Sequence, residues 1–553
     1  MNTVDVTFPD GRRVSVRTGT RVADLIEEHA PWETEHPVVA VSANNDITSL
    51  FFRLDVNTSL RPIALDSSEG QRVYRRSLCF LLYMAALDVT PERHLVIGHS
   101  LGDGYYYHFS EGEPVSEAEL TALSERMREI VAEDRAIIRR IYAYDDARRY
   151  FEDHDMADTA LLLKHRNDAR IPVYTCGDTV DISHGPLVPS TGYLKHFELT
   201  AYEPGFLLRY PNVRAPYEIQ PFAPSPLLFS VYQEYKEWGR ILNVSSAGKL
   251  NEQSANGEIR DFIRVNEALH NKKISEIADR IYDAADDLRI VLIAGPSSSG
   301  KTTFTKKLAI QLTVLGLRPI TIGLDNYFVP RERTPLDENG EYDFEHIEAI
   351  DIELLNEHLL ALFQGHDVEI PDFDFRTGQR KPSGTRLQLP HRGILLMEGI
   401  HGLNEDLTPR VTGAAKYKVY VSALTQLNLD DHNRVSTTDN RLIRRIVRDH
   451  KFRGHSALDT LHMWPSVRRG ENRNIFPFQD QADAAFNSAL DYELGVLRNH
   501  CEPLLHEVKP SHDVYHEAIR LLSFLNNFTP IPEKDVPGNS ILREFIGGSA
   551  FSY

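Results

Sequence analysis

The sequence predicts a multidomain protein: a small β-rich domain comes first, an α+β domain follows, and an α/β domain with a parallel sheet comes last. Three observations support this fold class. At about 100 to 200 residues per domain, a chain of 553 residues has room for several cores. Short alternating segments fill the first 63 residues, and mixed patterns continue to about residue 205. From residue 290 an apolar strand runs through a glycine-rich loop into a helix.

Composition and charge exclude several classes of protein. The net charge of −19 is not that of a general polyanion binder. The three cysteines, Cys79, Cys176 and Cys501, are too far apart for a disulfide framework or a zinc cluster. The longest apolar runs are about half of what a bilayer span needs, and the N-terminus lacks the apolar core of a signal peptide. We therefore expect a cytoplasmic protein without a membrane partner.

The first domain is expected at residues 1–63. Its alternating segments are VDVTF, RRVSV and VVAVS, and an amphipathic helical stretch begins near Val22. Residues 64–205 combine helical patterns at 70–87 and 116–140 with loop-rich sequence, which predicts an α+β domain.

Prolines are dense between residues 203 and 230, which prevents regular helix and marks a connector. A helical run at 255–285 then leads into the strand that opens the third domain. The last residues, 541–553, are expected to form a loosely held tail. The complete division is 1–63, 64–205, a proline-rich connector and helix at 206–285, the α/β domain at 286–510, and a C-terminal helix and tail at 511–553.

The strand IVLIA is followed by GPSSSGKTT and then by a helical pattern, which is the arrangement of a phosphate-binding P-loop. The glycines let backbone N–H groups point at phosphate oxygens, Lys301 neutralises the β and γ phosphates, and Thr302 holds Mg²⁺. The alternative is an ordinary Gly/Ser turn. The expected ATP-binding residues are Gly295, Ser297, Ser298, Ser299, Gly300, Lys301, Thr302 and Thr303.

Two further strands end in acidic residues. RPITIGL ends at Asp325, which can orient an acceptor hydroxyl and take its proton, as in a small-molecule kinase. GILLMEGIHGL carries Glu398, placed to bind Mg²⁺ directly or through water. The carboxyl ends of strands are where α/β sheets place their sites. The alternative for both is a solvated residue at a strand end.

An arginine-rich helical stretch follows. Residues 434–473 contain ten basic and four acidic side chains, a local balance of +6. Arg441, Arg444, Arg445 and Arg448 recur at helical spacing, so one face of one helix carries four guanidinium groups. Such a face can close over transferring phosphates as a lid. The competing interpretation is a solvated or RNA-binding basic helix.

These elements together resemble the uridine kinase family of the phosphoribulokinase and uridine kinase group. The matching motifs are GPSSSGKTT at 295–303, DNYF at 325–328, YDFEHIEAID at 342–351, PDFDFRTGQR at 371–380, MEGI at 397–400 and RLIRRIVRDHKFRG at 441–454. The resemblance implies that Asp325 is the base toward a nucleoside 5′-hydroxyl and that Glu398 assists Mg²⁺. It assigns Arg444, Arg445, Arg448 and Arg453 to the lid, and Phe328, Phe344, Glu345, Phe373 and Arg380 to the nucleoside pocket.

The departures from that family lie mainly in the pocket. Where the family carries an aromatic hydroxyl and a histidine, this sequence has Phe373 and Gly378. Phe373 can still stack on a base, but the polar groups that read a pyrimidine edge are missing, and apolar contact does not replace that discrimination. The departures therefore put uridine in question as the acceptor.

The first half resembles threonyl-tRNA synthetase. Residues 1–63 are similar to its TGS domain, a β-grasp fold, and residues 64–205 to its editing domain, through IGHSLGDGYYYHF at 97–109 and GDTVDISHGPLVPSTGYLKHFEL at 177–199. That domain uses an HxxxH pair and a Cys/His pair, and here those four positions are Arg76, Phe80, Ser183 and Leu187. Deacylation of mischarged tRNA is expected to be lost.

The sequence thus predicts an ATP-dependent kinase of a small-molecule alcohol, first of all a uridine- or cytidine-like nucleoside phosphorylated at its 5′-hydroxyl. The synthetase-like half is expected to bind a regulator, RNA or a second subunit, or to be kept for packing or dimerisation. Two alternatives remain open: a kinase of another sugar or alcohol, and an RNA-binding or nucleotide-sensing protein that uses the P-loop as a switch.

Overall fold

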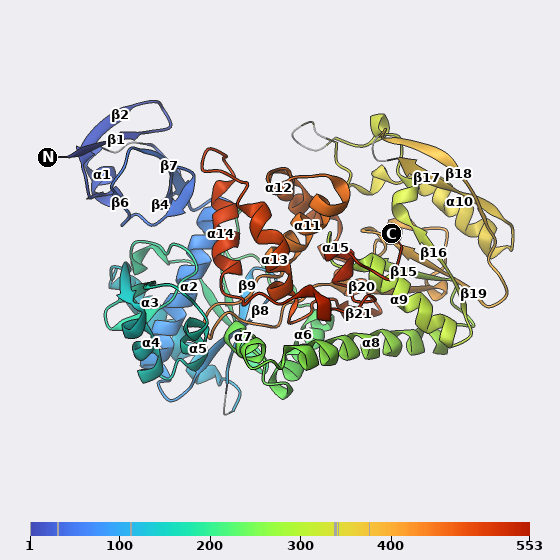
Figure 1. Cartoon of the computed structure of the whole chain (residues 1–553), viewed down its shortest axis with the longest axis horizontal. Coiled ribbons are helices and arrows are strands. Elements are labelled where there is room, and N and C mark those ends of the chain that lie inside the picture. The colour runs from blue at the N-terminus through green and yellow to red at the C-terminus, as the bar shows by residue number, and fades with distance from the viewer. Residues whose placement is uncertain are drawn as a thin grey trace.

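The structure, a computed structural model, describes residues 2–29, 32–110, 113–336, 340, 342–374 and 377–552. It confirms the predicted fold class. Figure 1 shows the two N-terminal units on one side and the P-loop sheet on the other, with the long helix α8 running toward that sheet.

The first unit is a five-stranded mixed sheet in the order β2-β1-β7-β4-β5, with β1 and β7 parallel. The helix α1 (Val22–His29) buries Val22 and Leu25 in its core, beside Val6 and Leu60. The strands are β1 (Thr3–Thr7), β2 (Arg13–Arg17), β4 (Val38–Ala43), β5 (Asp46–Thr48) and β7 (Thr58–Ala64), with β3 (Thr20–Arg21) paired to β6 (Arg53–Leu54).

The second unit is organised around α2 (Ser68–Val89), whose N-terminus is capped by the Ser67 hydroxyl and whose apolar residues are almost all buried. Two antiparallel sheets surround it, in the orders β13-β14-β9-β8 and β10-β11-β12. Its other elements are β8 (Leu95–Ser100), β9 (Gly104–Phe109), α3 (Glu117–Ala132), β10 (Ile138–Ala143), α4 (Tyr144–Asp153), α5 (Ala157–Lys164), β11 (Arg170–Cys176), β12 (Thr179–Asp181), β13 (Glu198–Tyr202) and β14 (Gly205–Arg209).

The connector contains three helices, α6 (Pro226–Ile241), α7 (Ala247–Ala255) and α8 (Ile259–Asp283). The proline-dense stretch before residue 226 is free of helix, and Pro226 is the first residue of α6. Proline is tolerated there because the N–H it lacks would have no partner within the helix. Helix α8 packs on the P-loop domain through apolar residues such as Ile274 and Ile281.

The P-loop domain is a five-stranded parallel sheet in the order β16-β19-β15-β20-β21. Its central strand β15 is fully buried because helices cover both faces: Val291 and Ile293 meet α8 and α9, and Ile290 and Leu292 lie in the core that contains α10. The elements are β15 (Ile290–Ala294), α9 (Lys301–Val314), β16 (Arg318–Gly323), α10 (Ile352–Phe363), β19 (Gly393–Glu398), β20 (Lys416–Ser422), α11 (Thr437–Arg453), α12 (Ala457–Asn474), β21 (Ala484–Asn487) and α13 (Glu493–Leu505), beside the hairpin β17 (Val368–Asp374) and β18 (Gln379–Leu387).

The expectation of a loosely held C-terminal tail is wrong. The helix α14 (Tyr515–Leu525) packs on the P-loop domain, and the chain continues along that domain through the short helix α15 (Arg543–Ile546). Ile541, Leu542 and Phe545 are each 0% exposed and belong to the same core as α9 and α11. A terminal segment is ordered when its apolar side chains pack within a core. Among the described helices, none combines the length and the apolar character that a membrane span requires.

Candidate active site

The P-loop connects β15 to α9 in the way that the sequence predicts. Gly300 has φ +82° and is the N-cap of α9, a backbone conformation that favours glycine. Gly295 is required for another reason, since a Cβ there would lie 2.0 Å from the carbonyl oxygen of Val421. The two glycines allow the loop to turn tightly and its backbone to approach β20. The N–H groups of the first turn of α9 are left without helical partners, as an anion site needs.

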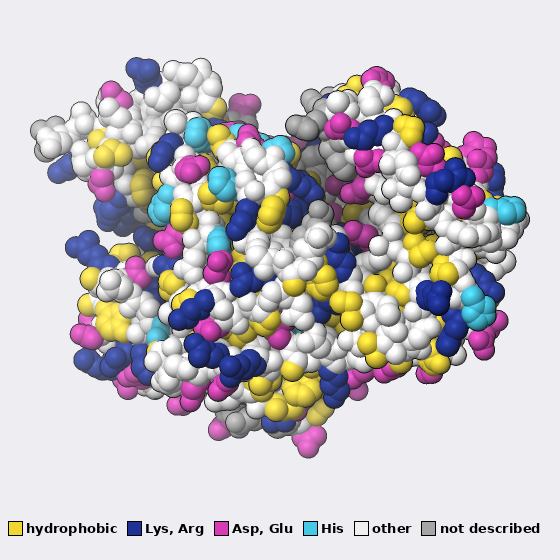
Figure 2. All heavy atoms as spheres, turned by 45° about the vertical axis from the view of Figure 1, so that its right-hand side comes forward, with side chains coloured by type: hydrophobic (Ala, Val, Ile, Leu, Met, Phe, Trp, Pro, Cys, Tyr) yellow, Lys and Arg dark blue, Asp and Glu magenta, His cyan; other side chains and the backbone are white. Residues whose placement is uncertain are grey.

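Four predicted residues, Lys301, Thr302, Asp325 and Glu398, meet at the carboxyl ends of neighbouring strands. The Thr302 hydroxyl donates to Oε1 of Glu398 at 2.8 Å, which joins the start of α9 to the end of β19. The Lys301 ammonium donates to the carbonyl oxygen of Pro296 at 3.1 Å and is within electrostatic reach of Glu398 and Asp325. Figure 2 shows the surface hollowed between the part that carries α12 and the part that carries β17 and β18.

Burial shifts the pKa values of Lys301, Asp325 and Glu398 toward pH 7. Burial raises the pKa of Glu398 to about 7, although Lys301 opposes the shift. Burial also raises the pKa of Asp325, opposed by the charges of Lys301, Arg453 and Arg448; its side chain keeps contact with solvent, which moderates the effect. Burial lowers the pKa of the Lys301 ammonium. Perturbed groups of both signs at one spot are typical of catalytic sites.

Thr302 and Glu398 fit a magnesium ion by the chemistry of their atoms. Hydroxyl and carboxylate oxygens are the hard ligands that Mg²⁺ takes in nucleotide sites, where it keeps several waters and binds few protein groups. The pair is partly buried, and it lies beside Lys301 where phosphates are expected.

The arginine face of α11 divides into two sets with different surroundings. Arg441 and Arg444 have side chains 1% and 0% exposed and are paired with Glu471 and Glu493. Each also donates to the P-loop backbone: Arg441 Nε to the carbonyl of Ser297 at 3.0 Å, and Arg444 Nη1 to that of Ser298 at 3.3 Å. These two buried guanidinium groups hold the P-loop backbone through hydrogen bonds and are not exposed to a ligand.

Arg445, Arg448 and Arg453 form the second set, and all three contact the buried carboxylate of Asp449. Nitrogen–oxygen distances are 3.2 Å for Arg445, 2.8 Å for Arg448 and 3.6 Å for Arg453. Arg445 also donates to the hydroxyl of Ser297 at 2.8 Å. Arg448 and Arg453 are close enough to Asp325 to influence its pKa. The three arginines thus surround one buried carboxylate, and Asp325 and Glu345 also act on members of this set.

The predicted acceptor residues gather in an aromatic cluster. The ring centroids of Phe328 and Phe373 are 5.4 Å apart, and those of Phe328 and Phe344 are 6.3 Å apart at 89°. Phe344 is 38% exposed while Phe328 and Phe373 are buried, so Phe344 offers a free face. An exposed aromatic ring of this kind can stack on a planar base.

The polar pocket residues have clear partners. Arg380 Nη1 donates to Oδ2 of Asp351 at 2.6 Å, and the other oxygen of Asp351 caps α10. Glu345 packs on Gly470 of α12. Burial raises the pKa of Glu345 to about 7, and the charge of Glu471 adds to the shift. Glu345 can therefore exchange a proton near neutral pH.

Sequence reasoning missed two acidic residues that contact the site, and it also missed one buried histidine. Asp449 holds the three arginines, and Glu471 accepts hydrogen bonds from the Ser297 N–H and from Arg441. The signal was present, since both are acidic residues within the basic stretch. His401, three residues after Glu398, is 1% exposed, and burial lowers its pKa to about 4. It has no sequence signal beyond its position.

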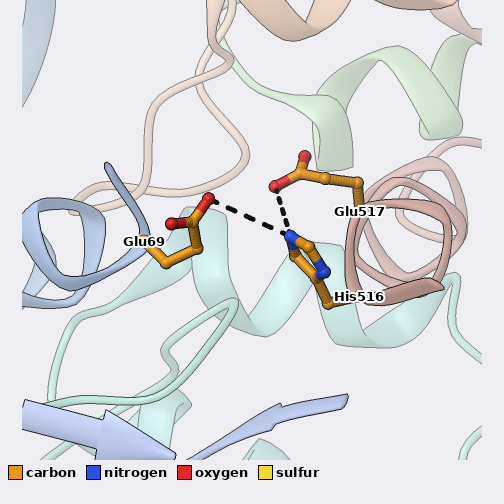
Figure 3. A group of neighbouring side chains, drawn as sticks. All are labelled: Glu69, His516 and Glu517. Atoms are coloured by element: carbon orange, nitrogen blue, oxygen red, sulfur yellow. Dashed lines mark ion pairs between the residues drawn. The ribbon is translucent and has the colours of Figure 1, made fainter. Parts of the chain in front are cut away.

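A possible metal-binding trio lies elsewhere, between α2 and α14. Glu69, His516 and Glu517 place three potential ligand atoms within 4.8 Å of one another (Figure 3). Arg72 already contacts both carboxylates, and Arg520 Nη2 lies 2.8 Å from Glu517. Two guanidinium groups in contact with the carboxylates repel a cation, so the trio is an ion-pair network that joins the two helices.

The synthetase-like cleft has a different content. At the four ligand positions of the resembling domain, Arg76 donates to the carbonyl of Pro186 at 2.9 Å, Phe80 and Leu187 are buried in the core, and the Ser183 hydroxyl donates to the carbonyl of Gly185 at 2.9 Å. Buried apolar side chains and a guanidinium offer no ligand to a metal ion.

A loop of the P-loop domain, residues 428–434, is inserted into this second unit. The Asn428 amide donates to the carbonyl of Ile97 at 2.7 Å, and the Ile97 N–H donates to that of Asp431 at 3.0 Å. His432 lies 3.0 Å from the buried carboxylate of Asp181. The loop leads directly into α11, so the synthetase-like unit is connected to the helix that braces the P-loop.

Comparison with known proteins finds matches to two parts of the chain. Residues 290–494 match a family model described as Phosphoribulokinase / Uridine kinase family. The chain is 33% identical over 194 residues to the threonine–tRNA ligase of Rubrobacter xylanophilus, covering 35% of this chain and 30% of that protein. It is 30% identical over 201 residues to that of Ehrlichia ruminantium, covering 36% and 31%. The chain thus spans about a third of the length of these relatives.

Two solved structures are similar over part of the chain. One is a possible uridine kinase from Bacillus stearothermophilus, with 18% identity and a TM-score of 0.25, covering 38% of this chain and 100% of that one. The other is a putative fructose transport system kinase from Silicibacter sp. TM1040, with 15% identity and a TM-score of 0.26, covering 38% and 98%. The family match confirms the recognition of a kinase-family P-loop domain at 290–494, and the curated relatives confirm the synthetase-like N-terminal region.

Proposed function

We propose that this chain, with its kinase-family domain at 290–494, is an ATP-dependent phosphotransferase that transfers the γ-phosphate to the 5′-hydroxyl of a nucleoside or a closely related alcohol. The observation that carries the proposal is the meeting of Lys301, Thr302, Asp325 and Glu398 at the carboxyl ends of β15, β16 and β19. A pure switch needs the phosphate-binding groups alone. Asp325 adds a base at the place where an acceptor hydroxyl would lie.

Asp325 would orient the acceptor hydroxyl and take its proton as the oxygen attacks phosphorus. Its raised pKa suits this role, because a base is most effective when its pKa approaches the working pH. Arg448 and Arg453, which influence Asp325 electrostatically, would stabilise the charge that spreads over the transferring phosphoryl oxygens. Lys301 would hold the β and γ phosphates in line with the hydroxyl.

Thr302 and Glu398 would hold a bound Mg²⁺, which supplies charge neutralisation across the phosphate oxygens. Arg441 and Arg444 fix the carbonyl groups of Ser297 and Ser298, so the N–H groups of the loop are oriented before nucleotide arrives. Such preorganisation spares the reorganisation that binding would otherwise require. Arg444 is thus proposed as a positioning residue, while Arg445, Arg448 and Arg453 face the ligand.

The aromatic cluster of Phe328, Phe344 and Phe373 supports a planar acceptor, because the ring of Phe344 is partly exposed beside the two buried rings. Glu345 and Arg380 are the polar pocket residues, although Arg380 is engaged with Asp351. A pocket that binds mainly by stacking accepts several bases. We therefore expect broader nucleoside specificity than a hydrogen-bonded pyrimidine site would have.

The synthetase-like half is proposed to act as an internal support. Its cleft receives residues 428–434, and its helix α2 carries Glu69 and Arg72, which contact α14. Both contacts connect it to the P-loop domain. Binding of RNA or a regulator there would have to use another surface than this cleft.

The test is ADP release by the whole protein with ATP and Mg²⁺ across a panel of nucleosides and sugar alcohols. We expect turnover with at least one nucleoside, abolished by both Lys301→Ala and Asp325→Asn. Activity restricted to a sugar alcohol would identify the other acceptor class. Nucleotide binding without turnover on any acceptor would favour the switch.

A further inference from the structure

The C-terminal segment, residues 533–552, packs directly on the P-loop. Ile541 Cγ2 lies 2.6 Å from the position that a Cβ on Gly300 would take, and the Arg444 guanidinium stacks over the ring of Phe545 at 4.9 Å. Lys451 of α11 donates to the carbonyl of Ile546, and Lys306 of α9 donates to that of Ser552. The segment is therefore held by both helices that border the nucleotide site.

Glu544 extends from this segment to the first turn of α9. Its Oε2 accepts hydrogen bonds from the Thr303 N–H at 3.1 Å and from the Thr303 hydroxyl at 2.7 Å. The Thr303 N–H is one of the four donors that the start of a helix leaves without an intrahelical partner. In a P-loop these donors bind phosphate oxygens. A protein carboxylate thus occupies donors that a nucleotide needs.

Electrostatics support the same conclusion. Glu544 lies within electrostatic reach of Lys301, the cation that the P-loop offers to phosphate, and of Glu398. A phosphate at the Thr303 donors and the Glu544 carboxylate would be two anions competing for the same N–H and the same hydroxyl. Like charges at contact distance repel each other strongly in a partly buried site.

We propose that the C-terminal segment is an internal competitor of the nucleotide, in which the Glu544 carboxylate takes the place of a nucleotide phosphate and must leave before ATP or ADP binds. This inference rests on the proposed nucleotide-binding function. Every nucleotide that binds moves Glu544 away from Thr303. At low nucleotide concentration the segment therefore stays on the P-loop, and it leaves when the nucleotide concentration is high enough to displace it.

The first experiment measures the Kd for ADP and for ATP with Mg²⁺, using the full chain and the variant Glu544→Gln. Charge-assisted hydrogen bonds are worth more than neutral ones, so we expect removal of the competing charge to tighten binding by about tenfold. The matched control is Glu533→Gln in the same segment, whose carboxylate pairs with His500 at 2.9 Å instead. It removes the same charge and is expected to leave the Kd unchanged.

Three results would overturn the inference while leaving nucleotide binding intact. Unchanged affinity in Glu544→Gln would show that the carboxylate does not compete, and weaker affinity would make it part of the bound site. An equal gain in Glu533→Gln would reduce the effect to overall charge. A chain that binds no nucleotide in any form would overturn the proposed function together with the inference.

A second readout does not depend on any substitution. Amide hydrogen exchange of the full chain is compared with and without ADP and Mg²⁺. We expect the amides of residues 541–547 to lose protection when nucleotide binds, while those of β15 stay protected. Increased protection of 541–547 would mean that the segment closes over the nucleotide, which contradicts displacement.

Discussion

Two regions of this chain resemble domains of two different kinds of enzyme, and the polar groups at the corresponding places have opposite surroundings. In the P-loop cleft, Lys301, Asp325 and Glu398 lie within electrostatic reach of one another, and their pKa values are shifted from the ordinary ones. In the synthetase-like cleft, Asp181 is satisfied by His432 of an inserted loop. A fold alone therefore does not decide activity, which depends on which polar groups the chain places at the site and what those groups contact.

The strongest test of this contrast exchanges one carboxylate in each cleft. We expect Asp325→Asn to lower kcat by about a thousandfold, within the range attributed to a positioned general base, with little change in Tm. Asp181→Asn is the matched control: it is expected to lower Tm and leave kcat unaltered. Steady-state kinetics and thermal melts decide, and a loss of kcat in Asp181→Asn would break the comparison.

The next test separates the two sets of arginines on α11. Arg444→Met leaves Glu493 buried without its partner, and we expect a loss of about 3 to 5 kcal/mol in the free energy of unfolding. Arg448→Met is expected to keep stability and to lower kcat by about a hundredfold. Denaturant titration together with kinetics measures both. If the two variants behave alike, buried and ligand-facing arginines are not functionally distinct.

The inserted loop predicts a pH dependence of stability. Burial disfavours the protonated ring of His432, but Asp181, with Asp431 and Asp430, outweighs it and holds its pKa above the ordinary value. A raised histidine pKa contributes stability below the unfolded value of about 6.5, and this contribution is lost as pH rises through the folded pKa.

The corresponding variant is His432→Asn, compared with the unaltered chain by thermal melts between pH 5.5 and pH 8.5, a range chosen to bracket that value, at about one-unit steps. We expect the variant to be less stable by about 2 kcal/mol at the acid end, with the gap narrowing as pH rises. His184 and His94, which face Asp430 and Asp431, remain in both proteins. A gap that widens with pH would contradict the assignment.

The smallest effect concerns the acceptor. Phe344→Ala removes the exposed stacking face, and since one base–aromatic stack is worth about 1 to 3 kcal/mol, we expect KM for the acceptor to rise about tenfold with kcat nearly constant. Phe344→Tyr keeps the ring and serves as the control. A change in the KM for ATP instead would place Phe344 away from the acceptor.

Much of the kinase site was predictable because its signals are local. A P-loop is written in consecutive residues, and Asp325 and Glu398 are found by asking where an apolar strand ends. Parallel strands then bring their carboxyl ends to one edge of the sheet without further information.

The arginine face shows where such reasoning stops. The spacing of Arg441, Arg444, Arg445 and Arg448 correctly places them close together on α11, but it does not say what covers them. Arg444 is buried because Glu493 and Phe545, 49 and 101 residues further along the chain, pack against it. Helical periodicity contains no information about partners at such separations.

The positions of the C-terminal tail and of the inserted loop could not be predicted from the sequence, for the same reason. The glycine-containing sequence of 541–553 has the composition of a free end, yet the structure buries Ile541 and Phe545 between helices. The contacts of residues 428–434 were not predicted either, because their partners Ile97 and Asp181 lie in another domain. Tertiary contacts decided both outcomes.

The inserted loop also sets an order of events during synthesis. The second unit is complete once β14 has been made at Arg209, but the residues that fill its cleft begin at Asn428. At 5 to 20 residues per second, the ribosome needs roughly 10 to 40 seconds to make the intervening chain. Throughout that interval Asp181 and Tyr83 lack His432, the partner that they contact in the complete chain. The second unit can therefore complete its contacts only after residues 428–434 have been synthesised.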